Sequence, residues 1–270
     1  VPLAPESSRR SEPLPLDKGR KLFEAHISQS RVTGGVRKST RRRYKVALDN
    51  FLPFAKAKGI SVWNGVTDRV VQDYAAHREE LGRADRTIST ELKTIKQVFR
   101  WLTEAGHLKG APPLKVKIRK LEAQRAYCYS AEEIATMIAH CRADEKLGWL
   151  GDVIATLAHT GLRISELVSL RWSDVDLVSK EKRLTLTDET GRPGQLGNHR
   201  RQLKSGRSRS FPIHPEVAAV LERLPRQDAY VFHGLRGDRV NADMVRQAFV
   251  RHVIKPLTKE FPTPEGERGF

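Results

Sequence analysis

Apolar side chains recur every three to four residues through the first part of the chain, which is the spacing of one face of an α-helix. Four such stretches follow one another, at about residues 17–27, 39–58, 67–81 and 87–105. Asp17 is expected to cap the first helix, and Gly59, Gly82 and Gly106 follow the other three, where a glycine commonly ends a helix. The pattern predicts a domain of four helices over residues 17–109.

The second half of the chain mixes helical with strand-like spacing. Ser130 opens S-A-E-E, a capping box for a helix, and a very apolar helix is expected over residues 149–159. The spacing then changes between helical and alternating. The expected strands are residues 174–177 and 183–187 and a short strand ending at 211–213. A short strand or an extended segment is expected at 229–232, and the expected later helices are residues 215–224 and 241–254. The predicted fold class is mainly α with a small antiparallel β-sheet, the sheet lying in an α+β domain over residues 130–270.

Segments without either period separate or end these domains. Residues 1–16 are rich in proline and serine, and we expect a flexible arm there. Residues 110–129 begin with prolines that forbid a helix and then alternate basic with apolar residues, which indicates an extended basic linker or, alternatively, a solvated edge strand. A mobile loop is expected at residues 188–202, and an unstructured tail from Pro256 onward.

The charge of the chain narrows the choice of partner. Lysine and arginine number 49 against 32 aspartates and glutamates, and the formal net charge of +17 favours a polyanion. Nucleic acid is therefore the leading candidate, and a merely basic protein is the alternative. No membrane partner is expected, because no apolar run approaches the roughly 20 residues that span a bilayer and no amphipathic helix combines a Lys/Arg face with a Trp/Phe face.

The cysteines and the N-terminal residues bear on the compartment. Cys128 and Cys141 lie in no CxxC pattern and beside no histidine at metal-ligand spacing, so we expect free thiols and no metal site. The N-terminal residues contain no apolar core of the kind found in signal peptides, which makes a cytoplasmic location the expectation.

Basic residues are concentrated on two of the expected N-terminal helices. They crowd the start of the second helix and recur at three-to-four spacing along the fourth, opposite its apolar stripe. Such faces are commonly only solvated, but two in one small domain favour contacts with a DNA backbone or with base edges. The candidate DNA-binding residues are Lys38, Arg41, Arg42, Thr87, Thr90, Lys93, Lys96 and Arg100.

The most informative stretch is residues 157–177, which read LAHTGLRISELVSLRWSDVDL. Thr160 and Gly161 interrupt the preceding apolar helix, and the apolar residues that follow predict a new helix with Arg163 in its first turn. Unpaired backbone N–H groups at such a position suit an anion, above all a phosphate. The alternative is that Arg163 only pairs with Glu166 on a solvated helix face.

T-G-L-R-I-S-E-L followed by L-R-W-S-D-V-D resembles the first arginine motif of the tyrosine recombinase family, of the lambda-integrase-like and Xer-like type. The later stretch L-K-S-G-R-S-R-S-F-P-I resembles the hairpin lysine motif of the same family. The helical N-terminal domain is similar to the SAM-like core-binding domain of these enzymes. The resemblance covers about residues 17–255.

The resemblance implies a role for each motif residue. Arg163 would clamp the scissile phosphate, Glu166 would hold the site together, and Lys204 would protonate the leaving 5′ oxygen. Arg207 and Arg209 would supply further cations and phosphate contacts. DNA would be cut and rejoined through a 3′-phosphotyrosyl bond, so no metal or nucleotide cofactor is implied. Intact relatives work as homotetramers on paired sites in double-stranded DNA.

The family's chemistry also uses an H-x-x-R arginine, a further histidine or tryptophan, and a tyrosine nucleophile. His233 and Arg236 have the right spacing, but they precede the helix expected at Asn241, whereas the family motif follows it, so we interpret the match as coincidence. No tyrosine follows Tyr230, for which a core position is expected. We expect a fragment that stops before these motifs and binds DNA without cleaving it. The alternatives are a non-catalytic DNA-binding regulator and a type IB topoisomerase-like enzyme.

Overall fold

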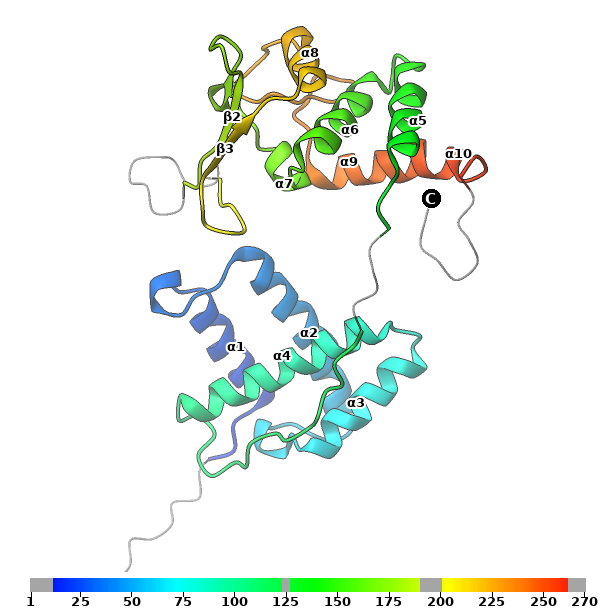
Figure 1. Cartoon of the computed structure of the whole chain (residues 1–270). Coiled ribbons are helices and arrows are strands. Elements are labelled where there is room, and N and C mark those ends of the chain that lie inside the picture. The colour runs from blue at the N-terminus through cyan, green and yellow to red at the C-terminus, as the bar shows by residue number, and fades with distance from the viewer. Residues whose placement is uncertain (1–11, 123–126, 190–200, 262–270) are drawn as a thin grey trace, which may run out of the picture. The chain divides into compact units, whose positions relative to one another are not determined.

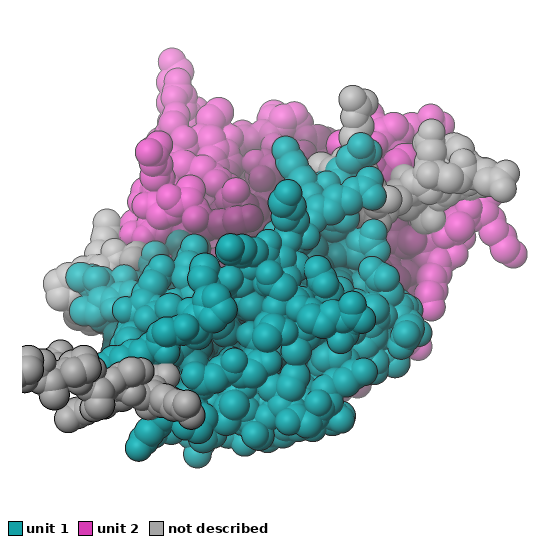
Figure 2. Space-filling view, turned by 90° about the horizontal axis from the view of Figure 1, so that it is seen from below, with its two compact units in different colours: residues 1–124 teal, residues 125–270 magenta. Residues whose placement is uncertain are grey.

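The chain folds into two units, residues 1–124 and residues 125–270, which are coloured separately in Figure 2. The computed structural model describes residues 12–122, 127–189 and 201–261. Each unit has its own hydrophobic core. Most of the expected flexible arm, mobile loop and unstructured tail lies outside the described residues. The predicted fold class, mainly α with a small antiparallel sheet, is confirmed.

Helices make up the first unit (Figure 1). They are α1 (Leu16–Ile27), α2 (Lys38–Ala57), α3 (Asp68–Glu80) and α4 (Asp85–Glu104). Gly59, Gly82 and Gly106 have φ angles of +77°, +66° and +77°, so each adopts the left-handed conformation expected after a helix. Thr67 caps α3 by accepting a hydrogen bond from the Val70 N–H.

Two expectations about the edges of this unit are wrong. Asp17 does not cap α1: it lies inside the first turn and pairs with Lys56, since the helix begins one residue earlier, at the buried Leu16. The last residues of the expected flexible arm are ordered as well, because Leu14 is also buried and Pro15 forms a β-bridge with Val62.

A buried carboxylate ties three helices of the first unit together. Glu91 of α4 accepts a forked pair of bonds from Arg78 of α3, at 2.9 and 3.0 Å. It also accepts bonds from the Tyr74 hydroxyl and from Asn50 of α2, each at 2.9 Å. Burial, then the bond to Glu91, raises the pKa of Tyr74. The network fixes how α2 and α4 lie against α3, and hence where their N-terminal ends meet.

The first part of the expected linker belongs to this unit. Val116 is buried, and Asp68 at the start of α3 accepts hydrogen bonds from the backbone N–H groups of Lys115 and Val116. Residues 113–118 therefore run along α4 instead of spanning freely between the units, because their apolar side chains extend the core of the helices.

Helices also dominate the second unit. They are α5 (Ala131–Arg142), α6 (Gly148–Thr160), α7 (Ile164–Leu167), α8 (Pro215–Arg223), α9 (Ala242–Phe249) and α10 (Lys255–Leu257), the last two joined by a π-helical turn (Val250–Ile254). The capping box of Ser130 and Glu133 and the cap by Asn241 are confirmed. In Figure 1, α9 and its continuation run alongside α6 and α5. The expectation of an unstructured tail from Pro256 is wrong for its first residues, because a proline is tolerated in the first turn of α10.

A small sheet completes the second unit. It contains β1 (Val175–Asp176), β2 (Arg183–Leu186) and β3 (Arg209–Pro212), antiparallel and in that order. Leu184 and Leu186 point into the core at alternate positions of β2, and the register sets Leu186 opposite Arg209. The segment 229–232 is extended and forms one bridge, from Tyr230 to Arg171, which agrees with the second of the two expected forms.

Candidate phosphate site and nucleic-acid interface

Arg163 lies just before α7, and not inside its first turn as expected. Gly161, with a φ angle of +61°, ends α6, and Leu162 turns into the core. Arg163 then takes the capping position in an extended conformation, and α7 is only four residues long. The side chain of Arg163 is 48% exposed. With so short a helix behind it, the guanidinium itself must supply the positive charge that a phosphate needs.

Glu166 connects Arg163 to a second arginine. Its side chain is only 4% exposed; Oε1 accepts a bond from Arg163 Nη1 at 2.9 Å. Oε2 accepts bonds from the Arg163 backbone N–H at 2.9 Å and from Arg209 Nη2 at 2.8 Å. The alternative of a solvated surface pair is therefore wrong, because the carboxylate is buried.

The charge balance at Glu166 favours an anion outside the protein. Burial by itself would raise the pKa of Glu166, but the bonds from Arg163 and Arg209 outweigh it and hold the pKa below its usual value. One buried negative charge thus orients two guanidinium groups that remain 48% and 36% exposed. The cluster has an excess of one positive charge, with planar donors available to the oxygens of a phosphate.

The β2–β3 hairpin brings Arg209 to this cluster and carries Lys204 in the turn before β3. The turn closes with a bond from the Gly206 N–H to the Leu203 carbonyl at 3.0 Å, and Gly206 has a φ angle of +67°. Lys204 and Arg207 are both exposed on this turn. The structure therefore brings Arg163, Glu166 and Arg209 into contact, while Lys204 and Arg207 lie on the same hairpin outside the ion-paired cluster.

Sequence reasoning missed four ion-paired residues on the segments that follow α7 and precede β3, of which Glu189 and Arg201 are buried and Arg171 and Asp174 are half-buried. Arg171 pairs with Glu189 at 2.5 Å, and Arg201 pairs with Asp174. These pairs were not predicted because residues 188–202 were expected to form a mobile loop. That stretch is rich in glycine and arginine, and its sequence gives no sign that Arg201 is buried. The only signal was the spacing of Arg171 and Asp174, which places a carboxylate within reach of the backbone three residues earlier.

In the first unit, candidate residues from two helices meet in a groove of about 430 Å³ at the starts of α2 and α4. The candidate Arg42 comes from α2, beside Arg43, while the candidates Thr87 and Thr90 come from α4. The Thr90 hydroxyl donates to the Arg86 carbonyl at 2.8 Å, which leaves its oxygen able to accept a further bond. A second groove, between α1 and α2, is lined by Lys38, Arg41 and Arg42 among others.

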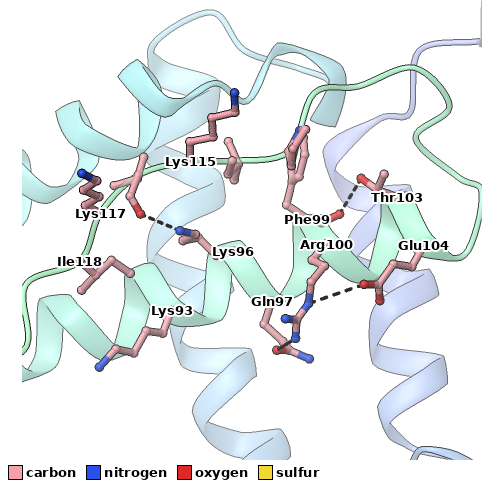
Figure 3. Close-up of a pocket in the computed structure, with 13 residues that line it drawn as sticks. Lys93, Lys96, Gln97, Phe99, Arg100, Thr103, Glu104, Lys115, Lys117 and Ile118 are labelled. Atoms are coloured by element: carbon pink, nitrogen blue, oxygen red, sulfur yellow. Dashed lines mark hydrogen bonds and ion pairs between the residues drawn. The ribbon is translucent and has the colours of Figure 1, made fainter.

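Lys93, Lys96 and Arg100 line a different groove, of about 1190 Å³, between α4 and residues 113–118 (Figure 3). Lys96 makes a hydrogen bond within the protein, because its Nζ donates to the Val116 carbonyl at 2.6 Å. Arg100 donates to Gln97 at 2.8 Å on the exposed face of α4. Lys93 is exposed, as are Lys115 and Lys117 on the other wall of the groove.

The remaining expectations concern the thiols and membrane helices. Cys128 is exposed and Cys141 is buried, and burial raises the pKa of Cys141 to about 11. Within residues 12–122, 127–189 and 201–261, no helix combines the length and the apolar character that a bilayer crossing needs.

Comparison with known proteins identifies relatives for both units. The model of the phage integrase family matches residues 129–266, and that of the phage integrase N-terminal SAM-like domain matches residues 21–106. Tyrosine recombinase XerC of Roseiflexus sp. (strain RS-1) is 25% identical over 203 residues, which cover 74% of this chain and 58% of the relative. XerC of Alcanivorax borkumensis is 25% identical over 201 residues, covering 73% and 62%. The chain thus spans about three fifths of the length of these two relatives.

Solved structures share the fold at low sequence identity. A lambda integrase dimer bound to a COC′ core site has a TM-score of 0.67 and 15% identity, with 90% of this chain and 64% of that chain covered. The Tn1549 transposon integrase in complex with circular intermediate DNA has a TM-score of 0.67 and 16% identity, with 94% and 82% covered. With family models matching both units, the chain belongs to the phage integrase family of tyrosine recombinases.

Proposed function

We propose that this protein is a site-specific recombinase or integrase that cuts and rejoins double-stranded DNA through a 3′-phosphotyrosyl intermediate. The observation that carries the proposal is the buried Glu166, whose two carboxylate oxygens hold the partly exposed guanidinium groups of Arg163 and Arg209. In this role Arg163 and Arg209 bind the non-bridging oxygens of the scissile phosphate.

The chemistry is an exchange of phosphodiester bonds. A tyrosine hydroxyl attacks phosphorus and loses its proton to solvent, the bond from phosphorus to the 5′ oxygen breaks, and Lys204 gives a proton to that oxygen. Negative charge builds on the non-bridging oxygens in the transition state, where the two guanidinium groups stabilise it. Rejoining is the reverse reaction with a new 5′ hydroxyl, so the step needs no external energy source.

The first unit would hold the duplex. Arg42, Thr87 and Thr90 line one groove, where the arginine and the two hydroxyl groups would contact the backbone of a DNA strand. Lys93 continues this exposed face along α4. The net charge of +17 supports a polyanion as the partner, and the lambda and Tn1549 integrases named above are complexes with DNA. In the intact protein we expect a homotetramer on paired DNA sites, and one of the similar structures is a lambda integrase tetramer bound to a Holliday junction.

The nucleophile is not expected among these residues. Tyr230 is the last tyrosine of the sequence, and its ring is covered by the Arg239 guanidinium, 3.4 Å from the ring centre. It is half-buried instead of lying in the core, because this arginine and the bridge to Arg171 cover it. His233 pairs with Asp228 at 3.2 Å. We therefore propose that residues 1–270 bind DNA but do not cleave it without further chain.

Trapping of the covalent intermediate tests the proposal. The natural full-length protein is incubated with DNA that carries a nick a few nucleotides to the 3′ side of the scissile phosphate, so that the short fragment with the released 5′ hydroxyl diffuses away and rejoining is blocked. We expect a protein–DNA adduct on the 3′ phosphate, and we expect residues 1–270 alone to shift the duplex without forming the adduct. A full-length protein that binds the cognate duplex yet forms no adduct would support the non-catalytic regulator. Adducts and relaxation on DNA of any sequence would support a topoisomerase.

A further inference from the structure

Four charged side chains, two of them buried and two half-buried, form a network on the segments that carry the phosphate site: Glu189 and Arg201 are buried, and Arg171 and Asp174 are half-buried. Arg201 Nη2 donates to Asp174 and to the Ser169 carbonyl, the latter at 2.8 Å. Arg171 Nη1 donates to Glu189 at 2.5 Å, and the Arg171 backbone N–H donates to Asp174 at 2.7 Å. We call these four residues the hairpin clamp.

The hairpin clamp joins the two chain segments that carry the proposed site. Arg171 and Asp174 follow α7, whose Glu166 holds Arg163. On the hairpin side, the Glu189 N–H donates to the Arg201 carbonyl at 2.9 Å, and the Arg201 N–H donates to the Glu189 carboxylate at 2.7 Å. The clamp thereby fixes the base of the hairpin against the segment that follows the phosphate site.

Lys204 follows the clamp after a short and anchored stretch of chain. It lies three positions after Arg201, which limits its Cα to about 11 Å from that of Arg201. Leu203 between them is 1% exposed in the core, and its N–H donates to Asp188 at 2.7 Å. On the other side of the turn, Arg209 is bonded to Glu166. The turn that carries Lys204 is therefore attached at both of its ends to residues 163–174, through Arg201 on one side and Arg209 on the other.

Stability alone does not explain why charges are buried here. Replacing a buried ion pair with apolar side chains of similar volume is often neutral or stabilising, because desolvation opposes the attraction between the charges. Directional bonds do restrict geometry, and a general acid must lie within hydrogen-bond reach of the atom that it protonates. A misplacement of about 1 Å can reduce a rate by about a hundredfold.

We propose that the hairpin clamp positions Lys204, so that its ammonium group reaches the leaving 5′ oxygen when the phosphate lies on Arg163 and Arg209. Arg201 and Glu189 are in this sense positioning residues and touch no reacting atom. The inference rests on the proposed function, in which Lys204 is the general acid.

The test compares two DNA substrates in single-turnover cleavage by the full-length protein. One has the natural phosphodiester, and the other has sulfur in place of the bridging 5′ oxygen at the scissile position. A thiolate leaves without protonation, because a thiol is far more acidic than an alcohol, so the sulfur substrate does not need a general acid. The variants are Arg201→Lys, which keeps the charge but loses the planar fork, and Glu189→Gln, which keeps the shape.

We expect Arg201→Lys and Glu189→Gln to cleave the natural substrate about 10 to 100 times more slowly than the unmodified protein. On the sulfur substrate, both variants should cleave at a rate within about threefold of that of the unmodified protein. Lys204→Ala should do the same. Arg163→Ala should remain slow on both substrates, because the phosphate charge still needs its guanidinium. Lys182→Gln, which removes an exposed pair with Glu222, is the matched control and should behave as the unmodified protein.

Equal losses on both substrates, or no loss on either, would overturn the role of the hairpin clamp. Slow cleavage of the sulfur substrate by Lys204→Ala, or no cleavage by the unmodified protein, would instead refute the proposed function.

Amide hydrogen exchange tests the hairpin clamp without relying on cleavage. In Arg201→Lys, exchange at residues 203–208 should accelerate about tenfold or more while that of α6 is unchanged. Unchanged exchange at residues 203–208 would overturn the clamp on its own.

Discussion

Glu166→Gln isolates the contribution of the buried charge that orients the two arginines. Three donors converge on this carboxylate, at 2.8 to 2.9 Å, and its side chain is 4% exposed. Hydrogen bonds to a charged group contribute about 1.5 to 3 kcal/mol each. Glutamine keeps one acceptor oxygen, and both arginines can turn partly into water, so we expect a net loss of about 2 kcal/mol. For a chain of this size that loss lowers Tm by about 4 to 8 °C.

Urea unfolding followed by circular dichroism measures this loss, with Glu181→Gln as the control. Glu181 is 80% exposed and pairs with Arg183 at 3.4 Å, so its replacement should change the stability by less than about 0.5 kcal/mol. The pH dependence gives a second check. The folded-state pKa of Glu166 is depressed, so its stabilisation is complete above the ordinary glutamate pKa and is lost as the pH falls through the lower, folded value. Equal stability of the two variants at neutral pH would refute the reasoning.

Three further predictions concern DNA binding and the first unit. Residues 1–270 should bind duplex DNA with log Kd rising with log salt at a slope steeper than about 5, as measured by fluorescence anisotropy, and a flat dependence would contradict the basic interface. Arg42→Ala and Lys93→Ala should each weaken binding to all sequences and reduce that slope by about 1, and an unchanged slope would remove the residue from the interface. Lys96→Met should chiefly speed proteolysis within residues 113–118, because Lys96 holds the Val116 carbonyl, and equal cleavage rates would show that this bond does not anchor the segment.

Local signals in the sequence account for much of the fold. The caps at Thr67, Ser130 and Asn241 are read directly, since each polar side chain bonds to backbone two or three residues away. The length of the helix after Arg163 cannot be read from the sequence in this way, although Leu167 and Leu170 are both buried as their spacing predicts. These leucines face the core whether the chain is helical or turns between them, so their periodicity could not reveal that α7 ends at Leu167.

The site depends on contacts that are distant in the sequence. Arg209 and Glu166 are 43 residues apart in the sequence and meet only in the tertiary structure, where Arg209 lies on β3 opposite Leu186 of β2. Similarly, Lys96 was expected to face DNA, but it bonds to a carbonyl 20 residues further along the chain. Residue type and spacing predict which side chains can bind phosphate, and the tertiary structure decides which of them already have a partner.

The central claim is that Arg163 neutralises charge on the scissile phosphate. It is tested most directly by single-turnover cleavage of DNA in which one non-bridging oxygen at the scissile position is replaced by a methyl group, which removes the negative charge. On natural DNA we expect Arg163→Ala in the full-length protein to lose about 2.7 to 4 kcal/mol of transition-state stabilisation, or about a hundred- to a thousandfold in rate. On the neutral substrate the account predicts that this defect shrinks to less than about tenfold. A defect of the same size on both substrates would contradict it.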